Sequence, residues 1–135
     1  MPTGTVRQIG YANRDNVAKN LAGITVGTWT TIRNTADSAS LSLTTTSLET
    51  SMYIDISVVG WGTAGYKYIR PTVDGVSPSS AAVSYLSDQV SNSSTTFVVT
   101  GLSLGSHTIG AQIMSPDTGS ISYRTVTIKV YEVKS

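Results

Sequence analysis

The chain has 135 residues, of which 13% are charged and 39% are hydrophobic, and its formal net charge is +1. Soluble domains average about 25% charged residues, so this composition argues against charge-driven disorder and against a strongly basic nucleic-acid binder. The 20 serines and 20 threonines supply most of the polar surface instead, and the absence of cysteine excludes disulfides and thiolate metal sites.

Residues 1–26 are predicted to form an extended arm ahead of the folded body, because their sparse apolar positions follow neither a helical nor a strand period. Residues 1–33 carry a charge balance of 4 − 1 = +3, whereas the remainder carries 5 − 7 = −2. A basic arm can become ordered on a negatively charged or β-rich neighbour, and a solvated terminus is the alternative. If the arm binds a partner, we expect the contacts to come from Arg7, Tyr11, Arg14 and Lys19.

From about Gly27 onward, short alternating runs are separated by Gly, Ser, Asn, Asp and Pro, which is typical of a β-sandwich or barrel. The expected strands cover residues 28–34, 41–43, 52–58, 66–73, 83–86, 95–100, 106–114 and 124–133. Asp74 and Gly75 form a strong hairpin signal, and the Ser-rich residues 77–96 are expected to be a loop with a short edge strand. The sequence therefore predicts an all-β fold over residues 27–135, an antiparallel jelly-roll sandwich of about eight strands.

His107 is the only histidine, so a Ser–His–Asp triad would need it as the base. No Gly-x-Ser-x-Gly motif accompanies it, and His107 opens a row of inward-facing positions. We expect a half-buried histidine bonded to a neighbouring strand or subunit. The carboxylates show neither the pairing of a glycosidase nor the spacing of a calcium loop. We therefore predict no enzymatic activity and no metal or cofactor; an enzyme would need His107 or a carboxylate pair in a cleft.

The segment Gly60–Gly65 has the glycines of a phosphate loop but precedes a strand rather than a helix, so it is expected to be a bend. Its Trp61, with Tyr66 and Tyr68 following, has a functional interpretation as well. Exposed aromatic rings can stack on a sugar ring or fill a pocket of a partner. Further tyrosines on predicted strands could supply subunit interface area: Tyr53, Tyr123 and Tyr131.

Three stretches carry a resemblance to a known family: residues 66–75 (YKYIRPTVDG), residues 96–109 (TFVVTGLSLGSHTI) and the strand 126–133. They resemble the jelly-roll domains of small tailed-phage virion accessory proteins, in which a strand ending in xVDG is followed by TGLxxGxHT and a closing strand. The resemblance covers about residues 28–133. Its motifs lie at turns and strand starts, so they specify fold more than function.

The resemblance implies a non-enzymatic virion structural protein, specifically a capsid decoration protein that forms trimers similar to tumour-necrosis-factor-like jelly rolls. The implied partners are the major capsid protein and further copies of the chain, with no nucleic acid and no membrane. The implied location is the capsid surface, after synthesis in the host cytoplasm.

No stretch approaches the ~20 apolar residues of a membrane helix, and the N-terminus lacks the pattern of a secretory signal. The alternative is a carbohydrate- or receptor-binding module of a phage fibre or tail.

Overall fold

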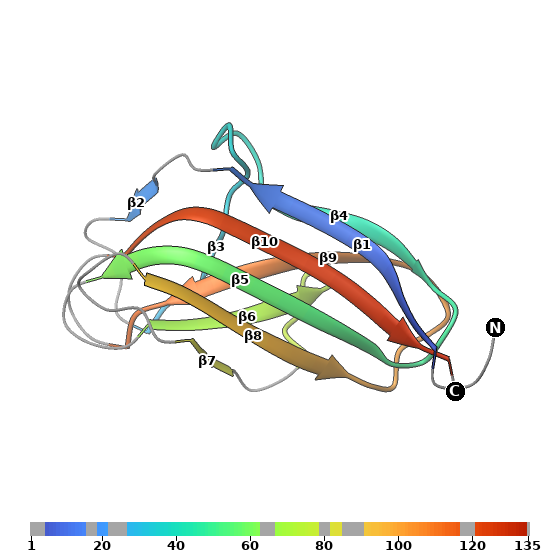
Figure 1. Ribbon diagram of the computed structural model, residues 1–135. Helices are drawn as coiled ribbons and strands as arrows, with labels where there is room; N and C mark the ends of the chain where they lie inside the picture. Colours follow the sequence, from blue (N-terminus) through green and yellow to red (C-terminus); the bar gives the residue numbers. More distant parts are fainter. Residues whose placement is uncertain are drawn as a thin grey trace.

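The computed structural model describes residues 5–15, 19–21, 27–62, 67–78, 82–84, 91–116 and 121–134. These residues form ten β-strands and no helix, arranged as two antiparallel sheets that lie face to face (Figure 1). Consistent with the lack of helices, the described part of the chain contains no helix able to span a membrane.

Sheet A has five strands. Four of them lie side by side, each hydrogen-bonded to the next, and the fifth pairs with the beginning of β10. In spatial order they are β1 (Val6–Arg14), β10 (Ile121–Val133), β5 (Met52–Gly62) and β8 (Ser91–Val99), with β2 (Lys19–Leu21) as the added strand. In sheet B, two short strands pair with different parts of β9. These are β3 (Thr30–Thr31) and β4 (Ser42–Ser47), followed in space by β9 (Gly105–Met114), β6 (Lys67–Val73) and β7 (Ala82–Ser84).

The strand order is that of a jelly roll. When β3 and β4 are taken as one interrupted strand and the short β2 is set aside, the strands numbered along the chain give the orders 1-8-3-6 in sheet A and 2-7-4-5 in sheet B. This is the double-sheet arrangement built from two Greek keys. The predicted antiparallel jelly-roll sandwich is therefore confirmed.

The core lies between the two sheets and follows the period of two that the sequence shows. On β5, Met52, Ile54, Ile56 and Val58 are buried, and their neighbours in sequence point outward. The row Ile109, Ala111 and Ile113 on β9 faces them from sheet B. Each fully buried aliphatic side chain of this size contributes about 1.5–3 kcal/mol.

The turn after β6 is a two-residue hairpin turn, as predicted. Asp74 and Gly75 both have positive φ, 52° and 82°, and the backbone N–H groups of Val73 and Val76 each donate to the carbonyl of the other residue. Positive φ at both central positions is the type I′ geometry, which matches the twist of antiparallel strands.

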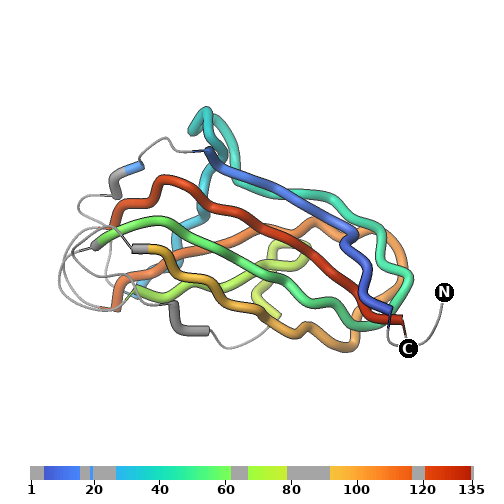
Figure 2. Tube along the Cα trace, in the orientation of Figure 1, coloured from blue at the N-terminus to red at the C-terminus, as the bar shows by residue number. Residues whose placement is uncertain are grey.

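The expectation of an extended arm is wrong for Val6–Arg14. These residues are the first strand of the jelly roll and pair with β10 from Val6 opposite Val133 to Arg14 opposite Val126 (Figure 2). The register shifts between Gln8 and Gly10, so a β-bulge interrupts the alternation by which a strand is recognised. The expectation is also wrong for Lys19–Leu21, which form β2 and pair with β10. Residues 1–4, 16–18 and 22–26 of the expected arm lie outside the described residues.

A second difference concerns the Ser-rich stretch 77–96. Ser91–Thr96 belong to β8 and pair along β5, whereas the sequence suggested that residues 77–96 form a loop with a short edge strand. The expected short edge strand is present as Ala82–Ser84 and pairs with β6. Residues 85 and 86, which were expected to continue it, lie outside the described residues.

Candidate functional site

Arg14, expected to contact a partner, is instead fully buried between the sheets. Its Nη1 donates to the carbonyl of Asn34 and lies 2.7 Å from Asp37 Oδ1. The guanidinium also sits over the ring of Tyr123, 5.0 Å from its centroid. The hydrogen bond from Arg14 holds the pKa of Asp37 below its usual range. This arginine therefore fastens the end of β1 to the loop before β4 and has no surface on which to meet a partner.

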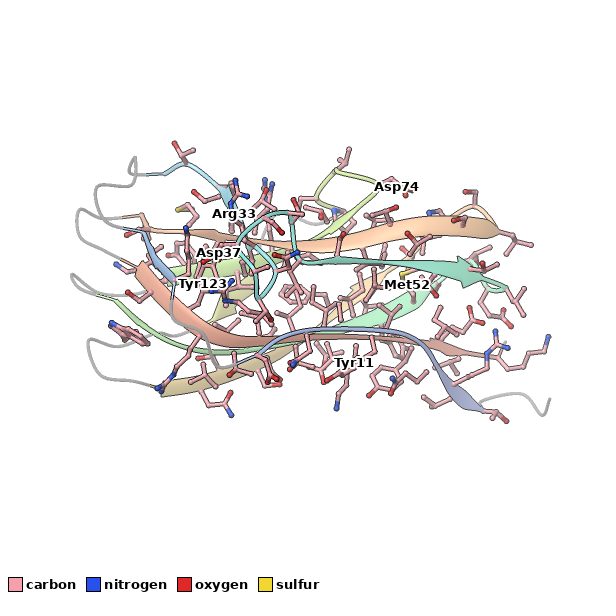
Figure 3. All side chains as sticks on the ribbon, turned by 90° about the horizontal axis from the view of Figure 1, so that it is seen from above. Tyr11, Arg33, Asp37, Met52, Asp74 and Tyr123 are labelled. Atoms are coloured by element: carbon pink, nitrogen blue, oxygen red, sulfur yellow. The ribbon has the colours of Figure 1, made fainter. Side chains whose placement is uncertain are left out.

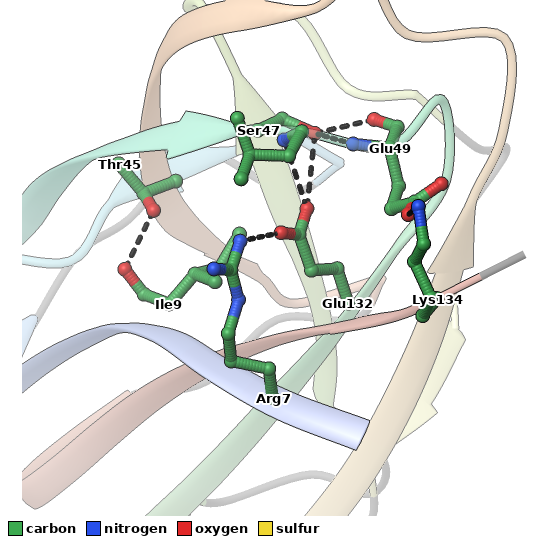
Figure 4. Close-up of polar contacts among 8 residues, drawn as sticks. Arg7, Ile9, Thr45, Ser47, Glu49, Glu132 and Lys134 are labelled. Atoms are coloured by element: carbon green, nitrogen blue, oxygen red, sulfur yellow. Dashed lines mark hydrogen bonds and ion pairs between the residues drawn. The ribbon is translucent and has the colours of Figure 1, made fainter. Parts of the chain in front are cut away.

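Arg7 is also used within the fold, at the opposite end of β1. Its guanidinium forms an ion pair with the buried carboxylate of Glu132, which accepts a second hydrogen bond from the backbone N–H of Leu48 at 3.1 Å (Figure 4). Nearby, the Thr45 hydroxyl donates to the carbonyl of Ile9 at 2.6 Å. These contacts join β1 to β4 across the open edge between the sheets.

The other two expected arm residues lie at the surface but apart. Tyr11 is 55% exposed on the outer face of sheet A, pointing away from the core (Figure 3), and Lys19 is half-buried on β2. The structure therefore does not bring Arg7, Tyr11, Arg14 and Lys19 together on one binding surface.

The outer face of sheet A carries an array of aromatic and apolar side chains, which we call the tyrosine face. Tyr131 lies opposite Tyr53, and Tyr53 lies opposite Val98 on the edge strand β8. Tyr11 and Trp61 complete the set on the same face. Tyr123, in contrast, is buried in the core, where its hydroxyl accepts a hydrogen bond from the Arg33 backbone at 3.1 Å, so it cannot supply interface area.

Charges on the tyrosine face are few and of opposite sign. Lys129 lies opposite both Tyr11 and Asp55 in the sheet register. The carboxylate of Asp55 accepts a hydrogen bond from the Ser94 hydroxyl at 3.3 Å, and Ser94 in turn accepts one from Ser57 at 3.1 Å. The centre of the face is thus a ladder of hydroxyl groups with one base and one acid.

Of the aromatic platform expected from Trp61, Tyr66 and Tyr68, the two described residues, Trp61 and Tyr68, lie on different sheets. Trp61 extends from β5 on sheet A, with the Arg124 guanidinium 5.8 Å from its ring centroid. Tyr68 extends from β6 on the outer face of sheet B, on the other side of the sandwich. Tyr66 lies outside the described residues.

The outer face of sheet B is hollowed at its centre, over Gly110 of β9. The hollow has a volume of about 290 Å³ and is lined by hydroxyl groups, an amide and backbone from Thr31, Ser40, Ser42, Thr72, Gly75, Thr108, Gly110 and Gln112. Beside it, Arg70 stacks on Trp29, with 4.1 Å from the guanidinium carbon to the ring centroid. Arg70 Nε also donates to Gln112 Oε1 at 2.8 Å. The sequence analysis missed this site, because its members come from four strands and no local motif joins them.

His107 has the structural role that was expected of it. It is buried at the start of the inward row of β9, with Nδ1 2.7 Å from Asp74 Oδ2 and Nε2 2.7 Å from the carbonyl oxygen of Ser103. Both ring nitrogens are therefore engaged by neighbouring segments. Within the described residues, no group of three or more His, Cys, Asp or Glu side chains could hold a metal ion.

Comparison with known proteins gives a likeness of fold only. No protein-family model matches the chain, and no curated protein matches it. Among solved structures, the chain is similar to the CBM36-1 domain of a multidomain xylanase from the hindgut metagenome of Trinervitermes trinervoides. The identity is 14%, the match covers 92% of this chain and 94% of that chain, and the TM-score is 0.43. We draw no functional conclusion from a likeness at this level.

Proposed function

We propose that this chain is a non-enzymatic structural protein of a bacteriophage virion, a trimeric decoration protein that attaches to the major capsid protein. The observation that carries the proposal is the tyrosine face of sheet A, which has the composition of a subunit interface. The resemblance seen in the sequence supports it further. The residues that carry the resemblance form β6 with its type I′ turn, the connection from β8 into β9, and β10.

Self-association through the tyrosine face has a simple physical basis. Tyrosine and tryptophan bury a large area at little conformational cost and are enriched at interfaces, whereas lysine and glutamate are depleted there. Val98 is 60% exposed and Tyr11 55% exposed, so apolar surface is available. Lys129 and Asp55 have opposite signs, so a second copy can pair its acid with the base of the first, while the further charge, Arg124, lies beside Trp61.

A closed ring of copies would also suit attachment to a capsid. Closed symmetry places the same patch on each protomer, and several weak contacts to a lattice raise the overall affinity without any strong single contact. Val6–Arg14 form part of sheet A, so attachment is proposed to use the outer surface of the assembled ring rather than these residues as a free arm.

The test uses a charge placed on the tyrosine face and an equal charge placed elsewhere. Val98→Lys puts an ammonium group on the face, and Leu104→Lys puts one on the connection before β9, where Leu104 is 64% exposed. Light scattering during size-exclusion chromatography is expected to show a trimer for the unchanged protein and for Leu104→Lys, and a shift to monomer for Val98→Lys. A monomer for the unchanged protein at micromolar concentration would contradict self-association.

Capsid attachment is tested separately, by sedimenting the protein with capsid particles that lack it. The unchanged protein and Leu104→Lys are expected to sediment with the particles, and Val98→Lys is expected to bind more weakly because it loses multivalency. If the trimer forms and no capsid protein retains it, self-association stands and the decoration role fails.

The alternative function, a carbohydrate- or receptor-binding module of a phage fibre or tail, is favoured by one different observation. This is the hydroxyl-lined hollow on sheet B, on the face that a trimer formed through sheet A would leave open. The platform of Trp61 and Tyr68 gives it no support, because those two rings lie on opposite sheets.

A further inference from the structure

The hollow on sheet B depends on a glycine that the backbone conformation does not require. Gly110 lies within β9, between Ser42 of β4 and Thr72 of β6, and it is not among the glycines with positive φ. Glycine inside a strand costs stability, and it marks places where a ligand or another backbone approaches closely. A Cβ atom at position 110 would lie 2.9 Å from Thr72 Oγ1. The missing side chain therefore leaves room for the hydroxyl of Thr72 and opens the floor of the hollow.

The walls of the hollow present hydrogen-bonding groups that the described part of the protein leaves unused. The side-chain hydroxyls of Thr31, Ser42, Thr72 and Thr108 make no hydrogen bond to any described residue. The Oε1 atom of Gln112 accepts a hydrogen bond from Arg70. The amide nitrogen of Gln112 is then the donor that remains for a ligand. A ligand that carries several hydroxyl groups would find both donors and acceptors at close spacing.

Arg70 adds a fixed positive charge at the edge of this polar surface. Its guanidinium is held from two sides, by the ring of Trp29 and by the hydrogen bond to Gln112. No carboxylate of the described residues forms an ion pair with it. Asp74 follows Arg70 by four residues, a separation of roughly 13 Å at the rise per residue of a β-strand. Its carboxylate is engaged by His107. A preorganised guanidinium with free amino groups is a strong binder of carboxylates.

We propose that the hollow over Gly110 is a binding site for an acidic carbohydrate, a sugar that carries a carboxylate. The hydroxyls of Thr31, Ser42, Thr72 and Thr108 would contact the ring hydroxyls, and Arg70 would receive the carboxylate. The volume of about 290 Å³ is near the lower end of the ~300–1,000 Å³ of small-molecule sites, which suits one or two sugar units. The site does not depend on self-association, since it lies on the other sheet.

Two kinds of acidic sugar and their neutral counterparts provide the probes. An oligogalacturonate is compared with its carboxyl-reduced form, and sialyllactose is compared with lactose, by titration of ¹⁵N-labelled full-length protein. At least one acidic sugar is expected to shift the amide signals of Thr72, Gly110 and Gln112, with affinity at least ~10-fold above that of its neutral counterpart. Added salt should weaken binding of the acidic sugar more than binding of the neutral one.

Arg70→Gln and Lys134→Gln form a matched pair, because each removes one positive charge and Lys134, which lies beside Glu49, belongs neither to the hollow nor to the tyrosine face. Arg70→Gln is expected to reduce the affinity for the acidic sugar to that of the neutral one, whereas Lys134→Gln leaves it unchanged. Arg70→Lys should recover only part of the loss, since an ammonium group lacks the planar fork. The oligomeric state of Arg70→Gln should equal that of the unchanged protein, so that this test and the test of Val98→Lys can fail separately.

Three results would overturn the proposal. One is the absence of shifts with both acidic sugars at ~10 mM, a concentration that detects even weak sites. Another is equal affinity for acidic and neutral sugars. The third is an equal loss of affinity in Arg70→Gln and Lys134→Gln, which would indicate attraction by net charge rather than a site at the hollow. Thermal unfolding of each variant checks that the fold persists.

Discussion

His107 of β9 and Asp74, in the turn after β6, are joined by a 2.7 Å contact between Nδ1 and Oδ2. The second ring nitrogen, Nε2, lies 2.7 Å from the carbonyl oxygen of Ser103. Because both partners can only accept, the imidazolium, with a proton on each nitrogen, satisfies both contacts. The Ser103 carbonyl and the Asp74 carboxylate accordingly raise the pKa of His107 above 6.5. The Thr108 backbone N–H and the His107 ring lower the pKa of Asp74 below 3.8.

The first prediction is that stability declines as the pH rises above about 6.5. Because folding raises the pKa of His107, its contribution to the free energy of unfolding is fully present below the unfolded pKa of 6.5. The contribution is lost as the pH rises through the folded pKa. Asp74 contributes above 3.8 and loses its contribution as pH falls through its lower folded pKa. Urea unfolding is therefore expected to give the highest free energy between about pH 4 and 6.5 for this pair.

His107→Gln supplies the control for this pH dependence. A glutamine has no titration in this range, so the decline above pH 6.5 should flatten, while the free energy at low pH drops by about 1–3 kcal/mol for the lost hydrogen bonds. If the unchanged protein and His107→Gln show parallel profiles from about pH 5 to 9, His107 does not control the pH dependence.

The second prediction concerns the buried arginine. Arg14→Ala removes the side-chain partner of Asp37 and one of the two donors to the carbonyl of Asn34, which also accepts from the backbone N–H of Asp37. Because Arg14 is fully buried while the carboxylate of Asp37 reaches solvent, the cost comes from the lost packing and hydrogen bonds of the arginine, and we expect about 2–4 kcal/mol. Lys19→Ala, which removes a basic residue from the same N-terminal region at a half-buried position, should change the free energy of unfolding by no more than about 0.5 kcal/mol. Similar losses in the two variants, measured by denaturant unfolding, would contradict the role of Arg14.

The third prediction concerns the bulge in β1, where a Cβ atom at Gly10 would lie 2.6 Å from Leu43 Cδ1. Gly10→Ala is expected to destabilise the protein by about 1 kcal/mol, because the atom in the way is the end of a partly exposed leucine side chain that can rotate at a modest cost. Leu43→Val removes the atom that would collide, so the double variant should lose less than the sum of the two single changes. A double-mutant cycle measures this coupling, and strict additivity would show that Leu43 does not limit the space at Gly10.

The fourth prediction is that Val6–Arg14 cannot be removed without loss of the fold. Deletion of residues 1–14 exposes the edge of β10 and uncovers Leu43, so we expect aggregation or a strongly lowered unfolding temperature. A truncation that stops before β1, at residue 4, is the reference. A soluble protein that unfolds at the same temperature after the longer deletion would mean that β1 adds little to the sandwich.

The sequence predicted the strands whose alternation is complete. Met52–Val58 and His107–Ile113 place apolar side chains at every second position, and Asp74-Gly75 is a local turn signal that needs no information from the rest of the chain. The jelly-roll assignment rested on such segments. Tertiary contacts only refined their boundaries, for example by extending the strand at 124–133 back to Ile121.

The sequence could not predict β1 or the beginning of β8. In β1 a bulge shifts the register, and Gly10 and Arg14 stand among the inward positions, so Ile9 and Ala12, which pack against the core, do not form a regular alternation. In β8, Ser91–Thr96 contain no apolar side chain, so the pattern gives no strand period. Burial of Arg14 depends on Asp37 and Tyr123, which are distant in sequence, and the site over Gly110 depends on four strands. Both follow from the packing of the sheets.

The position of β10 between β1 and β5 has a consequence for how the protein acquires its structure. The ribosome synthesises β1 and β5 long before β10, the strand that must lie between them. Sheet A therefore cannot close until residues 121–133 have left the ribosome. Almost all pairings in the sandwich join segments distant in sequence, and such topologies fold on the millisecond-to-second scale. Until β10 inserts, the facing edges of β1 and β5 are open, and this interval is when chaperones or premature association between nascent chains would act.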